Sequence, residues 1–364
     1  MEITDVKTYT LRIPIGRTVG DSRLSITDVY WVVVELTTDD GNIGTGWMGS
    51  LGYGPDLLER FVESQFADFL VGRNPWEIES IRADMRLQTI YYGELGMSAW
   101  PRSAIDVALW DLKAQAAGQP LYKFLGGSDP RVRAYASNMD AQHGFETLES
   151  LLESQAAEGF TAYKTKVGNK LLEEEAERLY VIREAIGSDA DLFIDANQAW
   201  TVNEAITAVD ELSEFDPSWV EEPISEFNID GHPRVAERID PPLATGEMFY
   251  RPERFGYLFK NGGIEVAQPD LIRAGGVTGQ LDVARQAASY DVPFAPHFYY
   301  SISAHLVSAA PTGWIIEYIP EYDIAPALET PPTIDDGYLE LSDEPGHGYA
   351  IDREAREEFE VSFD

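Results

Sequence analysis

The sequence contains no cysteine, which excludes a disulfide framework, a thiolate metal site and a cysteine nucleophile. No apolar run reaches the length of about 18 residues that a membrane-spanning helix needs. The N-terminal residues lack a basic region followed by an apolar one, so no secretory signal is predicted and we expect a cytoplasmic protein. A Gly-x-Gly-x-x-Gly motif after the first strand pattern is also missing, which removes the main sequence signal of a dinucleotide-binding fold.

Basic residues are scarce as well. The chain has 27 Lys and Arg against 63 Asp and Glu, a formal net charge of -36, and only 7 of the basic residues are lysines. Binding to nucleic acids or anionic membranes requires a basic surface, so neither is expected as a partner. An acidic, lysine-poor surface indicates a protein from a salt-adapted organism, where ions screen the self-repulsion. An ordinary acidic enzyme is the alternative.

The composition and length predict two domains. With 364 residues, of which 44% are hydrophobic, the chain can bury a large core. Strand patterns over 6–14, 29–36 and 43–47 precede helical periodicity from 55 to about 117, so residues 1–125 are predicted to form an α+β domain.

Residues 126–320 show a different pattern, in which short apolar runs alternate with helical periodicity. Eight strand candidates favour a closed barrel over an open doubly wound sheet. They cover residues 132–137, 162–166, 191–195, 219–221, 243–245, 264–267, 293–295 and 314–317. The last segment, 321–364, is rich in proline and acidic residues and is predicted to pack back on the first domain.

Polar residues follow the later strand candidates at regular intervals. They are Asp195, Glu221, Glu247, Asp270, His297 and Glu317, separated by 26, 26, 23, 27 and 20 residues. One βα unit of a barrel occupies roughly 25 to 30 residues, so each of these residues has the same position in a different unit. Because a barrel gathers its catalytic groups at the strand ends, these residues are predicted to form one site.

The first three of the six are carboxylates that follow successive strand candidates. Asp195, Glu221 and Glu247 offer only oxygen ligands, and hard oxygen ligands select a hard cation such as Mg²⁺. Acids placed at strand ends by chance in an acidic barrel are the alternative. The spacing favours one Mg²⁺ ion per site.

Candidate bases lie on both sides of this acidic set. Lys164 and Lys166 alternate along one strand and therefore point to the same side. Crowding two ammonium groups with a cation is expected to lower a lysine pKa and prepare a base, although a structural ion pair is the alternative. His297 and Asp270 follow neighbouring strands and are predicted to pair, so that the carboxylate orients the imidazole.

These motifs together resemble the enolase superfamily, and within it the mandelate racemase subgroup. The matching stretches are Lys164-Thr165-Lys166, Asp195-Ala196-Asn197, Val220-Glu221-Glu222-Pro223, Thr245-Gly246-Glu247, Gln268-Pro269-Asp270, Ala295-Pro296-His297 and Pro345-Gly346-His347-Gly348. The resemblance implies a modified TIM barrel, (β/α)7β, over 126–320, with the capping domain 1–125 completed by 321–364. It also implies a homo-oligomer acting on a small-molecule carboxylate.

The family chemistry implied is Mg²⁺-assisted removal of the proton α to the substrate carboxylate through an enediolate. Lys164 would add positive charge beside that carboxylate, and a protonated Glu317 would donate a hydrogen bond to it. Lys166 and His297 would act from opposite sides of the α-carbon. The stretch from Glu221 to Met248 resembles dehydratases of acid sugars, which predicts a hydro-lyase forming a 2-keto-3-deoxy acid. A racemase or epimerase of a 2-hydroxy acid and a non-catalytic binding barrel are the alternatives.

Substrate-binding residues are less defined by the sequence. Segments 16–27 and 48–53 resemble the two capping loops of the family. The candidates for contact with the substrate are Asn197, Arg17, Asp21, Arg23, Tyr299 and Tyr300. The loop residues among them can equally be solvent-exposed side chains without a binding role.

Overall fold

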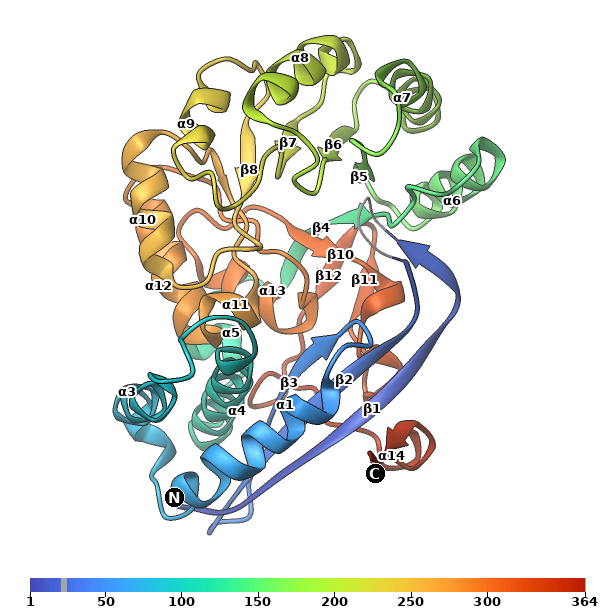
Figure 1. Ribbon diagram of the computed structural model, residues 1–364. Helices are drawn as coiled ribbons and strands as arrows, with labels where there is room; N and C mark the ends of the chain where they lie inside the picture. Colours follow the sequence, from blue (N-terminus) through green and yellow to red (C-terminus); the bar gives the residue numbers. More distant parts are fainter. Residues whose placement is uncertain (21–24, 364) are drawn as a thin grey trace.

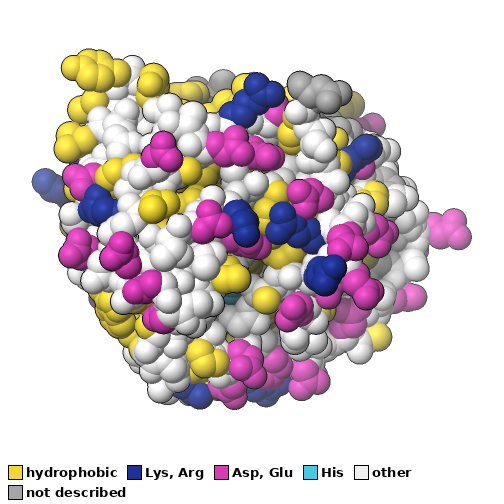
Figure 2. All heavy atoms as spheres, turned by 90° about the horizontal axis from the view of Figure 1, so that it is seen from below, with side chains coloured by type: hydrophobic (Ala, Val, Ile, Leu, Met, Phe, Trp, Pro, Cys, Tyr) yellow, Lys and Arg dark blue, Asp and Glu magenta, His cyan; other side chains and the backbone are white. Residues whose placement is uncertain are grey.

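The structure, a computed structural model, describes residues 1–20 and 25–363. Figure 1 shows the N-terminal strands and helices, in blue and cyan, below a larger unit in green to orange in which strands and helices alternate. Among the described residues, no helix is both long and apolar enough to cross a membrane. Acidic side chains are spread over the face shown in Figure 2, with fewer Lys and Arg side chains between them.

The N-terminal domain begins with an antiparallel sheet in the order β13-β1-β2-β3. Its strands are β1 (Ile3–Gly20), β2 (Ser25–Thr38), β3 (Ile43–Ser50) and β13 (Glu360–Val361). The first two are longer than the sequence predicts, because much of the polar segment expected as a loop between them is itself paired, as in Val19 with Ile26. The hairpin therefore reaches the barrel-like unit, where Gly20 forms a parallel bridge with Asp140.

Helices occupy the region where helical periodicity was predicted. They are α1 (Pro55–Val62), α2 (Asp68–Leu70), α3 (Ile78–Thr89), α4 (Trp100–Ala116) and α5 (Leu121–Phe124). Of these helices, α1 and α4 pack on this sheet. Helix α4 packs directly on β3, and glycines permit the close approach. A Cβ added at Gly46 would lie 2.0 Å from the Ala104 carbonyl oxygen, and one at Gly44 would lie 2.2 Å from that of Ala108.

The larger unit alternates strands and helices, as predicted. Its strands are β4 (Arg131–Ser137), β5 (Ala162–Lys166), β6 (Asp191–Asp195), β7 (Trp219–Glu221), β8 (Leu243–Thr245), β9 (Val266–Ala267) and β10 (Ile316–Tyr318). Its helices are α6 (Phe145–Ala157), α7 (Leu172–Ile186), α8 (Val202–Leu212), α9 (Gly231–Ala236), α10 (Pro252–Asn261), α11 (Leu271–Ala274), α12 (Gly276–Ala288) and α13 (Tyr300–Ala309).

Strands β4 to β9 pair in parallel in chain order, and β10 pairs in parallel with β4. The strand predicted at 293–295 is reduced to isolated parallel bridges, which Phe294 forms with Ala267 on one side and Gly313 on the other. These bridges continue the pairing from β9 toward the segment that leads into β10. The series of pairings thus returns to β4, which gives the barrel-like arrangement expected from the sequence.

The interior of this unit is filled by one side chain from each of the eight strand positions. These residues are Tyr135, Ala162, Phe193, Trp219, Ala244, Val266, Ala295 and Ile315. Phe193 and Trp219 stack with their ring centroids 3.4 Å apart. This layer closes the barrel interior below the strand ends, so the site has an apolar floor.

The C-terminal segment joins both domains. The hairpin of β11 (Thr333–Asp335) and β12 (Tyr338–Glu340) pairs with β4, whereas β13, which follows α14 (Arg353–Phe359), pairs with β1. Between them His347 is buried against the N-terminal domain, where its backbone N–H donates to Asp111 Oδ1 over 2.9 Å. The segment therefore contacts the N-terminal domain and also extends the barrel sheet.

Candidate active site

A layer of polar residues lies immediately above the apolar floor. Side chains two positions apart on a strand point to the same side, so the residue two places after a floor residue also points inward. This relation gives Ser137, Lys164, Asp195, Glu221, Gln268, His297 and Glu317. All of them except the partly exposed His297 are buried. The strand geometry therefore brings together residues that are up to 180 positions apart in the chain.

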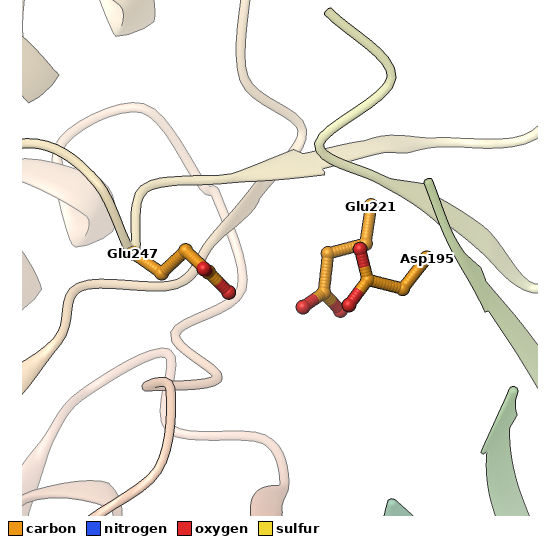
Figure 3. A group of neighbouring side chains, drawn as sticks. All are labelled: Asp195, Glu221 and Glu247. Carbon is orange, nitrogen blue, oxygen red and sulfur yellow. The ribbon is translucent and has the colours of Figure 1, made fainter. Parts of the chain in front are cut away.

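The predicted metal ligands are close enough to share one cation. Ligand oxygens of Asp195, Glu221 and Glu247 all lie within 4.8 Å of one another, and all three residues are buried. Figure 3 shows Asp195 and Glu221 side by side, with Glu247 pointing toward them across a gap. Burial and the neighbouring carboxylates raise the pKa of Glu221 to about 7, against the opposing charge of Lys164. Three buried carboxylates with no nitrogen or sulfur ligand among them fit a hard divalent cation such as Mg²⁺.

Both predicted lysines point into this layer and form ion pairs. Lys164 Nζ lies 2.6 Å from Glu221 Oε1 and 2.6 Å from Glu317 Oε1, and Lys166 Nζ lies 2.6 Å from Asp195 Oδ2. Burial disfavours the ammonium form of Lys166, but the Asp195 carboxylate outweighs burial and raises its pKa. The protein's own charges therefore raise the lysine pKa, whereas the predicted lowering includes the charge of a bound cation. A cation bound by Asp195 would compete with Lys166 for that negative charge.

The predicted pair of Asp270 and His297 is present in the structure. His297 Nδ1 lies 3.0 Å from Asp270 Oδ2, and the two residues form a parallel bridge. Asp270 is itself held by the backbone N–H groups of Ile272 and Arg273, each of which donates to Oδ1 over 2.9 Å. Burial disfavours the protonated imidazole, but Glu247 and Asp270 outweigh burial and raise the pKa of His297 to about 8.

The surroundings of Glu317 correct one expectation. Its carboxylate accepts hydrogen bonds from Ser137 Oγ over 2.7 Å and from the Phe298 N–H over 2.8 Å, in addition to the ion pair with Lys164. Burial works against the charged form, but Lys164 outweighs burial and holds the pKa of Glu317 well below its ordinary range. Glu317 is thus set as a carboxylate rather than the protonated acid that was predicted.

A cavity of about 430 Å³ opens above the carboxylates, and Lys166 and His297 both line it. Asn197 also lines it and is 4% exposed, and its Oδ1 has no hydrogen-bond partner among the described residues. This orphaned acceptor can receive a hydrogen bond from a hydroxyl group in the cavity. The remaining wall is mostly apolar or aromatic and includes Leu51, Tyr53, Trp100, Met139, Met248, Phe298, Ile319 and Tyr322.

The other predicted contact residues behave differently from one another. Tyr299 lines the cavity, and its hydroxyl accepts a hydrogen bond from the Gly49 N–H over 2.9 Å. Tyr300 does not line the cavity, because it begins α13 and packs against Tyr318 with ring centroids 4.8 Å apart. Asp21 and Arg23 lie outside the described residues, and so does the side chain of Arg17.

Two residues that hold the layer in place were not among the predicted site residues. Gln268 donates to Glu221 Oε2 over 2.7 Å, and Asp140 accepts from Thr165 Oγ1 over 2.7 Å and from the Lys166 N–H over 3.1 Å. Gln268 directly follows the strand candidate 264–267 and lies in one of the family motifs, and both signals could have marked it as a site residue. Asp140 lies in the loop after β4, three positions beyond the strand end, and gives no such signal.

Fold and site together define a class of protein, a capped barrel-like enzyme fold with a buried carboxylate cation site at its strand ends. Residues 4–126 match the family described as mandelate racemase / muconate lactonizing enzyme, N-terminal domain, and residues 146–355 match the family described as enolase C-terminal domain-like. The chain belongs to the enolase superfamily, in the mandelate racemase/muconate lactonizing enzyme subgroup, as its motifs predicted.

Individual relatives cover nearly the whole chain. A 3,6-anhydro-α-L-galactonate cycloisomerase from Streptomyces coelicolor is 30% identical over 97% of this chain and 98% of the relative. An L-talarate/galactarate dehydratase from Salmonella typhimurium is 31% identical over 94% of this chain and 87% of the relative. A solved structure of a racemase from Streptomyces coelicolor with bound magnesium superimposes with a TM-score of 0.94, at 30% identity, covering 99% of this chain and all of that one.

Proposed function

We propose that the protein removes the proton α to the carboxylate of an acid sugar and expels a β-hydroxyl group, which yields a 2-keto-3-deoxy acid. The observation that carries the proposal is one cavity in which two proton-transfer groups, Lys166 and His297, adjoin a buried set of three carboxylates. Dehydratases of acid sugars among the relatives support this choice of substrate.

The carboxylates Asp195, Glu221 and Glu247 would hold Mg²⁺. The ion supplies positive charge that stabilises the negative charge developing on the substrate carboxylate as the proton leaves. Lys164 is buried, with 1% of its surface exposed, so solvent does not screen its charge. It adds a fixed positive charge at the base of the same site. Gln268 keeps Glu221 oriented through its 2.7 Å hydrogen bond.

Two groups can move the proton. Lys166 contacts Asp195 at one end of the carboxylate set, and His297 lies with Nε2 3.3 Å from Glu247 at the other. A substrate between them would present its α-carbon to one group and its β-hydroxyl to the other. In dehydration, Lys166 takes the α-proton and His297, oriented by Asp270, protonates the departing hydroxyl.

A cycloisomerase is the second candidate, since two of the relatives carry that activity. The same α-proton is removed at the start, but a ring oxygen of the substrate leaves instead of water, so the product has the composition of the substrate. A racemase would return the proton to the α-carbon. These outcomes differ in product mass and in the presence of a keto group.

The first experiment is a screen of acid sugars, including galactarate, talarate and arabinonate, with Mg²⁺ and detection of keto acids. We expect a keto acid with the mass of the substrate less one water. A product of unchanged mass supports the racemase when the substrate is an open-chain acid and the cycloisomerase when the substrate contains a ring oxygen. No turnover of any acid sugar contradicts the proposal.

The roles of the two bases are tested by deuterium exchange into recovered substrate. His297→Asn is expected to retain α-proton exchange through Lys166 but to lose elimination. Lys166→Ala is expected to lose that exchange. Each lost reaction should slow by a factor of roughly 10² to 10⁴. Lys170→Ala removes an exposed lysine nearby and serves as the control. Exchange and turnover at the wild-type rate in both active-site variants would show that neither residue is a base.

A further inference from the structure

The two residues that follow His297 have a backbone conformation that bulky side chains rarely adopt. Phe298 has a φ of 52° and Tyr299 has a φ of 44°, both in the left-handed region. In this region the backbone crowds the Cβ atom of any residue other than glycine, so the conformation persists only where surrounding contacts enforce it. Strained residues of this kind cluster at functional sites, and this turn directly follows one of the two proposed proton-transfer groups.

The contacts that enforce the turn come from the N-terminal domain. Trp31 of β2 is fully buried. Its ring stacks on Phe298 with centroids 5.8 Å apart and meets Tyr299 edge-to-face at 5.7 Å. The Gly49 N–H of β3 donates to the Tyr299 hydroxyl over 2.9 Å. Gly49 pairs with Trp31 in the sheet, and a Cβ added to Gly49 would lie 3.1 Å from the indole ring. Trp31 is therefore held between its own sheet and the turn.

Tryptophan at position 31 has a cost that the filling of an apolar space does not explain. Its Nε1–H is buried and has no hydrogen-bond partner among the described residues. A buried donor without a partner destabilises the folded state, and phenylalanine or leucine would fill an apolar position without that cost. The indole ring contacts both residues of the strained turn at once, which gives a reason for the larger side chain.

The turn adjoins the polar layer at two points. His297 is joined to Asp270 by a backbone bridge and by the 3.0 Å contact of Nδ1, and its Nε2 lies 3.3 Å from Glu247. The next N–H along the chain, that of Phe298, donates to Glu317 over 2.8 Å. A shift of the turn would therefore move the imidazole relative to both glutamates.

Lys166 has a different set of contacts. It lies on β5, its backbone N–H donates to Asp140 over 3.1 Å, and its ammonium group lies 2.6 Å from Asp195. Neither of these two partners belongs to β2 or β3. A shift of the turn is therefore expected to leave Lys166 in place.

We propose that Trp31 is a positioning residue for His297, so that the N-terminal domain controls the elimination step. The assignment rests on the proposed function, in which Lys166 takes the α-proton and His297 protonates the departing hydroxyl. Loss of the indole lets the strained turn relax and displaces the imidazole from the β-hydroxyl. Removal of the α-proton continues, because Lys166 keeps its own contacts.

The first test needs no substrate. The chain has five histidines, so NMR of protein isotope-labelled at histidine gives few ring signals, and His297→Asn identifies the signal of His297. In Trp31→Leu we expect this signal to shift or broaden. Trp47→Leu is the matched control, because Trp47 is buried on the same sheet but has His347 as its aromatic partner, with ring centroids 5.3 Å apart. The control should perturb the His347 signal and leave that of His297 unchanged.

The second test measures elimination and α-proton exchange in the Mg²⁺-loaded protein, with the acid sugar that the screen identifies. Misplacement of a reacting group by about 1 Å can cost roughly 10² in rate, so Trp31→Leu should slow elimination by about tenfold or more and keep exchange within about threefold of the wild type. Trp31→Phe retains a ring against Phe298 and should restore most of the elimination rate. Mg²⁺ affinity should be unchanged in both variants, as expected for an intact carboxylate set.

A second variant of the turn covers the case in which Trp31→Leu does not fold. Tyr299→Phe removes only the hydroxyl that accepts from Gly49. It should shift the His297 signal and lower the ratio of elimination to exchange without raising KM. A higher KM with an unchanged ratio would assign the hydroxyl to substrate binding and overturn the proposal.

Three further results also overturn it. They are a His297 signal in Trp31→Leu that matches the wild type, an equal shift of that signal in Trp47→Leu, and a loss of elimination and exchange by the same factor. A wild type that turns over no acid sugar contradicts the proposed function alone, and the NMR comparison still decides whether Trp31 positions His297.

Discussion

A buried aspartate next to the active-site wall gives a sharp prediction about stability. Asp323 is 2% exposed. It directly follows Tyr322, which lines the active-site cavity. Burial raises the pKa of Asp323 from 3.8 to about 7, although the Ala325 N–H and the Tyr300 hydroxyl offer hydrogen bonds that favour the carboxylate. The folded protein therefore prefers the neutral acid, whereas the unfolded chain ionises at an ordinary pKa.

The sign and size of the effect follow from this difference. Between pH 4 and pH 7, approximately, the folded state binds more protons at Asp323 than the unfolded state does, so the free energy of unfolding falls as the pH rises. The interval between 3.8 and about 7, at about 1.4 kcal/mol for each pH unit, gives a loss on the order of 4 kcal/mol. Above that interval the loss is complete and constant.

Asp323→Asn removes the titration and keeps the size of the side chain. Calorimetric melting temperatures between pH 4.5 and pH 8.5 should show the variant gaining on the wild type as the pH rises, with the largest difference above pH 7. Asp240→Asn, at an exposed aspartate, controls for the change in net charge. Two melting curves that stay parallel across this range, or a variant less stable at pH 8, would refute the reasoning.

Three further outcomes are expected. Glu221→Gln should lower Mg²⁺ affinity and abolish turnover while the fold is kept, and calorimetry that finds undiminished affinity would reject Glu221 as a ligand. The melting temperature should rise with KCl, because salt screens the repulsion within a chain of net charge -36. The Debye length shrinks from about 10 Å at 0.1 M to about 3 Å at 1 M. A melting temperature that does not change with KCl would indicate an ordinary acidic protein. Asp140→Ala should reduce kcat without changing Mg²⁺ affinity, because Asp140 holds the backbone of Lys166 and not a metal ligand. An equal loss of kcat and of Mg²⁺ affinity would contradict this role.

Much of the barrel and its site was predictable from the sequence, because both depend on short-range regularities. Alternating apolar runs and helical patterns located β5, β6, β7 and β8 at their observed bounds. Repeated intervals then placed Asp195, Glu221 and His297 at equivalent strand ends, since a strand directs every second side chain inward. The family motifs added the expectation of Mg²⁺ and of an acid-sugar substrate.

The protonation states were decided only by the tertiary structure. Whether Lys166 and Glu317 carry a charge depends on which groups come within about 3 Å, and Coulomb interactions at that distance outweigh any preference of the residue itself. The sequence could not show that Asp195 pairs with Lys166, or that Lys164, Ser137 and the Phe298 N–H surround Glu317.

Local backbone turns and long-range convergence explain the remaining differences. Tyr299 and Tyr300 are adjacent, but Tyr299 has a φ of 44° and α13 begins at the next residue, so one side chain lines the cavity and the other enters the core. One cavity of about 270 Å³ brings Arg82 of α3 together with Arg273 of α11, although the two residues belong to different domains. No spacing along the chain encodes such a meeting, because it results from how α3 and α4 pack against the barrel.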